Sequence, residues 1–150
     1  MDSKKYILMG IGNTLQGDDG IGSIIAQSFK DRDWLSIDCG VVPENFTSII
    51  KKNRPDLVVI IDAVEMDLKS GEFRIISPDR ISALHLITTH SMPLSFLISY
   101  LKEYTQKLIF IGIQPKIIDY SNSVSPEVLK SFEEIIKILK GKKFKLLKKL

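Results

Sequence analysis

The sequence predicts an α/β fold, a single doubly wound, mostly parallel twisted sheet of about five strands with helices on both faces. Apolar runs rich in β-branched residues alternate along the chain with stretches whose apolar residues recur every three to four positions. No internal repeat, low-complexity segment or linker interrupts this alternation, and 150 residues are enough for one core. We therefore expect residues 1–150 to form one domain.

The expected strands are short and largely apolar. The run 56–63 is rich in β-branched residues, which is typical of strands covered on both faces of a sheet. The segment 71–77 follows a turn at Ser70 and Gly71, and we expect it at an edge of the sheet. In chain order the predicted strands are 5–12, 35–38, 56–63, 71–77 and 107–113.

The expected helices have one apolar face each. In the segment 92–104, Leu94, Leu97, Ile98 and Leu101 follow the i, i+3, i+4, i+7 spacing of an amphipathic helix. In chain order the predicted helices are 21–30, 43–54, 92–104 and 126–139.

Composition and charge exclude several classes of protein. The hydrophobic fraction of 44% and the charged fraction of 26% are ordinary for a globular chain. The longest apolar runs are too short to span a bilayer, and the N-terminus lacks a signal-peptide pattern, so we expect a cytoplasmic protein without membrane contact. The single cysteine, Cys39, cannot form an internal disulfide, which suits a reducing compartment and excludes a cysteine zinc cluster.

The basic charge is confined to the C-terminal tail, residues 140–150. This tail contains six lysines and no acid, and subtracting them from the net charge of +3 leaves −3 for the rest. The body therefore gives no reason to expect a nucleic-acid partner. We expect the tail to be a solvated helical extension rather than a contact for an acidic partner or a membrane surface.

Four acids are expected at one edge of the sheet, because ligands of doubly wound sheets bind beyond the carboxyl ends of the strands. Asp18 and Asp19 follow the first strand, Asp38 ends the second and Asp62 ends the third. His90 lies in "TTHSMP", just before a helix that Ser91 is expected to cap, in a loop that could reach the same edge. His85 has no such setting, and we interpret it as an ordinary surface or core histidine.

The glycine-rich turn "GIGNTLQGDDG" superficially matches a dinucleotide-binding fingerprint. The third glycine of that fingerprint should fall at position 15, which is Leu15. Asp18 and Asp19 would also stand at the helix N-terminus, where they would repel a pyrophosphate. Nucleotide binding is therefore not the favoured interpretation.

The acids also have purely structural interpretations. An aspartate stabilises a helix start through capping and the helix dipole, and this interpretation suffices for Asp18. Asp19 is flanked by Gly17 and Gly20, which allow a backbone to approach closely, so we favour a functional role for it. Asp62 could cap a turn, but its expected place opposite the first turn favours a site.

Three chemistries remain open for this edge. Asp19, Asp62 and His90 would suit a borderline divalent ion such as zinc or nickel, with coordination positions left open. Cys39 and His90 could instead act as a nucleophile and its base, but nothing in the sequence places the two in contact, and we favour a small buried cysteine after a strand. Alternatively, Asp19 and Asp62 could share a proton, as two aspartates do in aspartic proteases, if they lie very close together.

Six motifs occur in a defined order along the chain: "GIGNTLQGDDGIG", "DCGVVPEN", "VVIIDAVEM", "GEFRII", "TTHSMPLSFLISYL" and "IFIGIQP". Together they resemble the hydrogenase maturation proteases, the nickel-dependent endopeptidases that trim the large subunit of nickel-iron hydrogenases. The resemblance extends to about Leu139 and leaves out the lysine-rich tail. It is greatest to the branch that processes hydrogenase 3, of the formate hydrogenlyase type, which shares "TTHSMPL" and "GIQP".

This resemblance implies a function and a set of site residues. It implies Asp19, Asp62 and His90 as metal ligands, and Asp38, in the "D-x-G" motif, as a residue of cleavage or substrate recognition. The implied catalytic residues are Asp19, Asp38 and Asp62, with Asp38 or Asp19 as the candidate general base.

The implied reaction removes a short C-terminal extension from the hydrogenase large-subunit precursor after nickel insertion. The enzyme would recognise that nickel rather than carry its own, although other divalent ions can use the same ligands. We expect a monomer whose partner is the precursor. The alternative function is a non-catalytic nickel-binding chaperone of the same large subunit.

Overall fold

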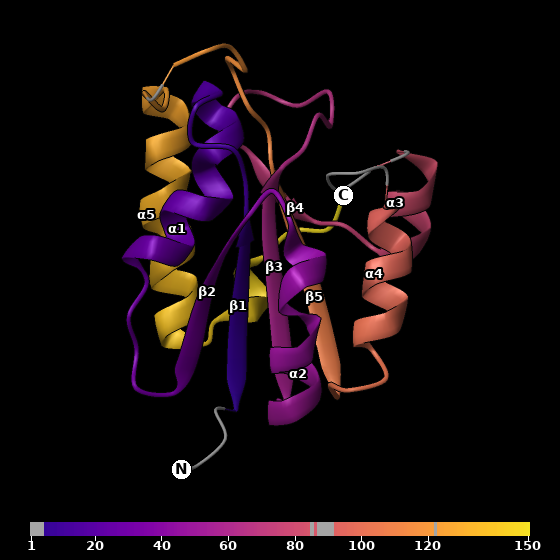
Figure 1. Ribbon diagram of the computed structural model, residues 1–150. Coiled ribbons are helices and arrows are strands. Elements are labelled where there is room, and N and C mark those ends of the chain that lie inside the picture. The colour runs from indigo at the N-terminus through magenta and orange to yellow at the C-terminus, as the bar shows by residue number, and fades with distance from the viewer. Residues whose placement is uncertain (1–4, 85, 87–91, 122) are drawn as a thin grey trace.

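The computed structural model describes residues 5–84, 86, 92–121 and 123–150, which form a twisted five-stranded sheet with helices on both faces (Figure 1). The strand order is β2-β1-β3-β5-β4. The strands are β1 (Tyr6–Ile11), β2 (Trp34–Gly40), β3 (Leu57–Ala63), β4 (Phe73–Ile75) and β5 (Lys107–Ile113). The α-helices are α1 (Ile21–Ser28), α2 (Thr47–Asn53), α3 (Pro78–Ala83), α4 (Leu94–Leu101) and α5 (Pro126–Gly141). Short 3-10 turns are η1 (Gly17–Gly20), η2 (Pro43–Phe46) and η4 (Phe144–Leu146).

The sheet confirms the predicted fold class. Strands β2, β1, β3 and β5 pair in parallel, and only the short edge strand β4 runs antiparallel, beside β5. The chain passes from β1 to β2 on one side and then to β3 on the other. This reversal at β1 is a topological switch point, where sheets of this kind bind their ligands.

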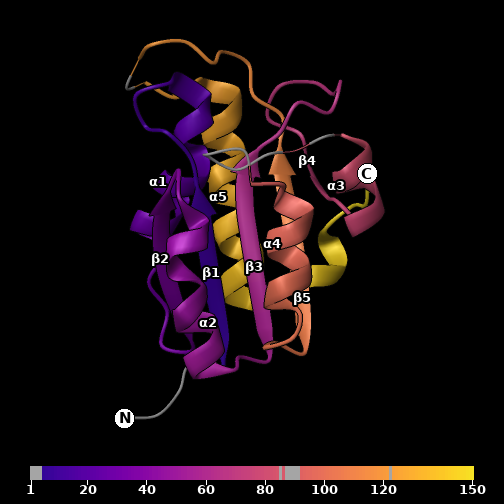
Figure 2. The same cartoon turned by 45° about the vertical axis from the view of Figure 1, so that its right-hand side comes forward.

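The core forms two layers, one on each face of the sheet. Alternate residues of the strands point to opposite faces, so that Ile7 and Met9 enter one cluster and Leu8 enters the other. Helices α2, α3 and α4 supply the first cluster, whereas α1 and α5 supply the second. Figure 2 shows α2 and α4 in front of the sheet with α5 behind it.

Several elements differ from their predicted bounds. The segment 43–54 divides into the turn η2 and the helix α2, and α4 begins at Leu94, after Pro93, instead of at residue 92. The predicted cap, Ser91, lies outside the described residues. Helix α3 was not predicted, because six residues with a single buried side chain, Ile81, show too little apolar periodicity.

The prediction of a helical tail is wrong, although the six lysines of the tail are exposed as expected. Helix α5 ends at Gly141, and Lys142 adopts a left-handed conformation with a φ of 53° that turns the chain back. Leu147 is only 7% exposed. The N–H of Ile75 donates to the carbonyl of Lys148 at 2.7 Å, and the N–H of Leu150 donates to the carbonyl of Ile75 at 2.9 Å. The tail therefore lies along β4.

None of the helices in the described ranges has the length and apolar character needed to cross a membrane.

Candidate functional site

Asp19 stands in η1, directly after β1 and its loop. The backbone N–H of Asn13 donates to Asp19 Oδ2 at 3.3 Å. The side chain is half-buried, and burial raises the pKa of Asp19 despite this hydrogen bond. No cation among the described residues is recorded as lowering that pKa.

Asp62 stands at the end of β3, the strand next to β1. Gly10 of β1 is in register with Ile61, so Asp62 follows at the same edge of the sheet. The backbone N–H of Ala63 donates to Asp62 Oδ1 at 2.8 Å. Burial, and then the negative charge of Asp19, raise the pKa of Asp62 well above its usual value. The structure therefore brings Asp19 and Asp62 together, as the sequence predicts.

Two like-charged carboxylates at one partly buried edge have two ways to lower their repulsion. They can hold a proton, or they can bind a cation. Within the described residues, no group of three or more His, Cys, Asp and Glu side chains is arranged to hold a metal ion. The predicted third ligand, His90, lies outside the described residues, as does His85. A cation held by these two carboxylates alone would need further ligands from elsewhere.

Asp38 stands at the same edge, but on β2, at the other side of β1. Its Oδ1 accepts hydrogen bonds from Ser23 Oγ at 2.6 Å and from the N–H of Gly40 at 3.0 Å, and its Oδ2 accepts one from Gln27 Nε2 at 2.8 Å. Burial opposes ionisation, but these three hydrogen bonds together lower the pKa of Asp38. Asp38 is thus a fixed, exposed carboxylate separated from Asp62 by one strand.

Asp18 has a structural role, as predicted, but the prediction that its side chain caps its own helix is wrong. The side chain is 1% exposed and accepts hydrogen bonds from the backbone of the β5–α5 loop. Lys116 N donates at 2.8 Å, Ile117 N at 2.9 Å, and Ser125 donates through both N and Oγ at 2.7 Å. Burial opposes ionisation, but these hydrogen bonds lower the pKa of Asp18. Asp18 therefore joins η1 to the start of α5.

The glycines beside Asp19 admit the protein's own backbone. Gly17 has a φ of 59°, and a Cβ there would lie 2.8 Å from the carbonyl oxygen of Ile117. A Cβ on Gly20 would lie 2.7 Å from the Cα of Thr14. Both glycines are therefore explained by the packing of η1 against neighbouring loops, and this packing fixes the position of Asp19 between them.

The structure argues against Cys39 as a nucleophile. Cys39 is 1% exposed, and its Sγ faces the carbonyl of Ile37 at 3.8 Å. Burial, with smaller contributions from the charges of Asp38 and Glu44, raises the pKa of the thiol to about 12. The reactive thiolate is therefore scarce near neutral pH.

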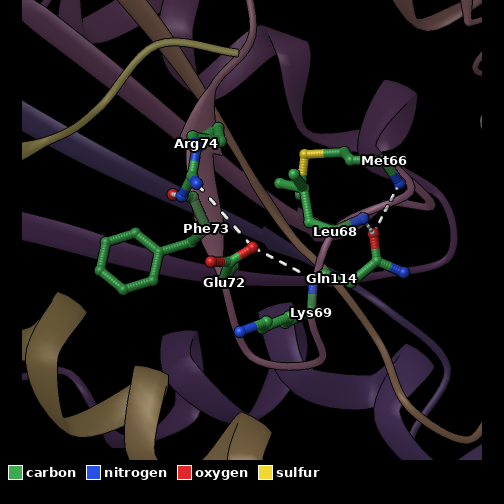
Figure 3. A network of polar contacts seen from close by, with 7 residues as sticks. All are labelled: Met66, Leu68, Lys69, Glu72, Phe73, Arg74 and Gln114. Atoms are coloured by element: carbon green, nitrogen blue, oxygen red, sulfur yellow. Dashed lines mark hydrogen bonds and ion pairs between the residues drawn. The ribbon is translucent and has the colours of Figure 1, made fainter.

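Gln114 is a structural residue of the site that the sequence left unassigned (Figure 3). It follows β5 and is 4% exposed. Its Oε1 accepts from Met66 N at 2.7 Å and from Leu68 N at 3.3 Å, while Nε2 donates to Glu65 Oε2 at 2.7 Å. Gln114 thereby holds the loop that directly follows Asp62. Its only sequence signal is a polar residue at the end of a buried strand.

These features define an α/β protein with an acid pair at the switch point of its sheet, a site suited to cation binding and to proton transfer. The comparisons with known proteins specify it further. A family model described as hydrogenase maturation protease matches residues 21–142. The hydrogenase 3 maturation protease of Escherichia coli K12 is 38% identical over 138 residues, covering 90% of this chain and 88% of that protein. A putative hydrogenase maturation protease of Methanocaldococcus jannaschii is 36% identical over 148 residues, covering 91% and 86%.

Solved structures agree with these matches. A crystal structure of the hydrogenase 3 maturation protease superposes with a TM-score of 0.87 at 38% identity, covering 92% of this chain and 90% of that one. The crystal structure of a nickel-iron hydrogenase maturation protease from Thermococcus kodakarensis gives a TM-score of 0.79 at 31% identity, with coverages of 93% and 92%. The chain therefore belongs to the hydrogenase maturation protease family, and it is a peptidase.

Proposed function

We propose that this protein is the endopeptidase that removes the C-terminal extension of a nickel-iron hydrogenase large-subunit precursor after nickel insertion. The observation that carries the proposal is the Asp19 and Asp62 pair at the sheet edge, in a chain of this family. The relatives named above are proteases, which favours peptide hydrolysis over the alternative of a non-catalytic nickel-binding chaperone.

Asp19 and Asp62 are proposed to bind the nickel that arrives with the precursor, with His90 as a third ligand. The charge of Asp19 raises the pKa of Asp62, so a divalent cation between the two would relieve their repulsion. Mixed carboxylate and imidazole ligation suits borderline ions such as nickel, and other divalent ions can use the same donors. A precursor without nickel would leave the two carboxylates uncompensated and would bind weakly.

Proton transfer is proposed to involve the same acid pair rather than Asp38. Burial raises the pKa of Asp19 and Asp62, and an oxygen of either carboxylate that does not bind nickel would be the stronger base, whereas hydrogen bonds lower the pKa of Asp38. Water gives one proton to the acid pair, its oxygen bonds to the scissile carbonyl carbon, the C–N bond breaks, and the departing amine takes the proton. Asp38, fixed and exposed, is assigned to substrate recognition.

The proposal is tested by mixing the purified protein with nickel-loaded and nickel-free precursor and measuring intact masses. We expect loss of a defined C-terminal fragment from the loaded precursor alone. Asp19→Asn and Asp62→Asn should abolish this loss in folded protein. Asp38→Asn should weaken binding of the precursor, and so raise KM, more than it lowers kcat.

A matched control is Asp56→Asn, which changes an exposed aspartate just before β3, at the opposite end of that strand from Asp62. This variant should cleave like the wild type. A stable complex of wild type and loaded precursor without any mass change would instead favour the chaperone. Equal cleavage of loaded and nickel-free precursor would refute recognition of the metal.

We also propose that the protein acts as a monomer in the cytoplasm. A single buried cysteine is compatible with a reducing compartment. Light scattering after size-exclusion chromatography tests the first proposal, and cell fractionation tests the second.

A further inference from the structure

A second concave region lies away from the acid pair. A cavity of about 780 Å³ opens between the loop that leads into β4, one face of α5 and the C-terminal tail. Its walls come from residues 69–74, 127–138 and 143–148, and include none of Asp19, Asp38 or Asp62. The proposed peptidase site therefore does not account for this groove, which we call the tail groove.

The tail groove carries an excess of unpaired positive charge. Two of its acids are already paired, Glu72 with Arg74 at 3.8 Å and Glu127 with Lys116 at 2.9 Å. Among the described residues that line the groove, the only other acid is Glu134; the neighbouring Glu133 does not line it. Five exposed lysines of the walls have no recorded ion pair with any described residue: Lys69, Lys130, Lys137, Lys143 and Lys148.

Apolar side chains lie among these lysines. Phe73 of β4, Ile138 of α5 and Leu146 of η4 all line the tail groove. Leu146 is 63% exposed, although it stands beside a buried residue, Leu147. Apolar surface surrounded by lysines is suited to a ligand that has both carboxylates and apolar side chains.

The walls of the tail groove are held in place by hydrogen bonds. Gly71 N donates to the carbonyl of Gln114, and Gln114 N donates to the carbonyl of Glu72, both at 2.8 Å. Glu72 Oε2 also accepts from Lys69 N at 3.1 Å (Figure 3). On the opposite wall, the tail is bonded to Ile75. The groove is therefore preformed, which reduces the entropy cost of binding.

We propose that the tail groove binds an acidic, extended polypeptide segment of a protein partner. The charge excess supplies the complementarity, and the concave shape with apolar residues favours a peptide over two other anionic partners. A flat membrane surface would meet the rim of the groove rather than its apolar lining. A nucleic-acid backbone is charged at every unit and would place a negative charge beside Glu134, which a peptide can avoid with an uncharged residue at that position.

The test uses a short fluorescein-labelled peptide in which Asp and Glu alternate with Leu, and measures its binding by fluorescence anisotropy. Lys130→Glu/Lys137→Glu should weaken binding about tenfold or more, because two attractions become repulsions. Leu146→Asp should weaken it as well. Binding should fall as salt is raised.

The matched control is Lys52→Glu/Lys102→Glu, which makes the same charge change on an exposed lysine in α2 and on one directly after α4, on the other face of the sheet. This control should bind the peptide within about twofold of the wild type, because it leaves the groove unchanged. Asp19→Asn should also bind normally, which separates this inference from the peptidase proposal.

Several results would overturn the inference. They are absence of peptide binding to the wild type, equal weakening by the control pair, or tighter binding of poly-uridine RNA or of phosphatidylserine vesicles than of the peptide. Circular dichroism of each variant excludes misfolding as the cause of a loss. If Lys130→Glu/Lys137→Glu does not fold, Lys143→Glu/Lys148→Glu is tested in its place and should weaken peptide binding by the same factor.

Discussion

The buried carboxylate of Asp18 connects η1 to the β5–α5 loop, and replacing it should lower the stability of the whole protein. Asp18→Ala removes the acceptor of four hydrogen bonds from the β5–α5 loop. These donors are partly buried, so water can replace the carboxylate only in part. At about 1 kcal/mol for each hydrogen bond, the free energy of unfolding should fall by about 4 kcal/mol. Asp18→Asn keeps one acceptor oxygen and should cost about half as much.

Urea unfolding monitored by tryptophan fluorescence measures this loss. Trp34 is the only tryptophan, and it is buried in ring contact with Tyr6 and Phe29 at centroid distances of 5.3 and 5.4 Å. The control Asp56→Ala changes an exposed aspartate and should stay within about 0.5 kcal/mol of the wild type. If Asp18→Ala lost no more than this control, the hydrogen bonds of Asp18 would contribute nothing to stability, and our reasoning would be refuted.

Four further measurements test other parts of the structure. Iodoacetamide should not modify Cys39 in the native protein, because burial keeps the thiol protonated. The intact mass of the treated protein should be unchanged, and its peptidase activity should equal that of untreated protein. The pKa of Asp38 is lower in the folded protein than in the unfolded chain, so ionised Asp38 stabilises the fold at any pH above its unfolded-state pKa. This stabilisation is lost as the pH falls, and the difference in unfolding free energy between wild type and Asp38→Asn should therefore shrink below about pH 4 in urea titrations. Leu147→Ala should cost about 2 kcal/mol in the same unfolding assay, whereas a solvated tail would lose almost nothing. Gln114→Ala should speed amide exchange in the loop after β3, and unchanged exchange would argue against its hydrogen bonds there.

The sequence predicts most of the sheet because its strands carry strong local signals. The predicted bounds of β5, 107–113, are those of the structure, since a continuous apolar run with clear ends leaves little freedom. Helix α3 was missed because its signals, Ser77 and Pro78 at its start, are short and common in turns. Local pattern therefore predicts long buried elements better than short exposed ones.

The positions of site residues could be predicted where they depend only on the order of the strands in the sheet. Asp19 and Asp62 meet because the parallel neighbours β1 and β3 end at the same edge, and that follows from the order of strands. The role of Asp18 was not predictable, because its partners Lys116, Ile117 and Ser125 lie 98, 99 and 107 residues away, and three of the four donors are backbone N–H groups that any residue supplies. The tail was misread because its lysines dominate its composition, whereas the burial of Leu147 depends on tertiary contacts.

The pairing of the tail with β4 has a consequence for self-association. An edge strand offers unpaired N–H and C=O groups to other chains, and β4 is the short antiparallel edge of this sheet. Here the tail occupies that edge at Ile75, and its lysines add charge that disfavours the approach of a second copy. Proteolytic clipping after Leu146 would expose the strand, remove Lys148 and Lys149, and leave this edge open to pairing with the same edge of a second copy.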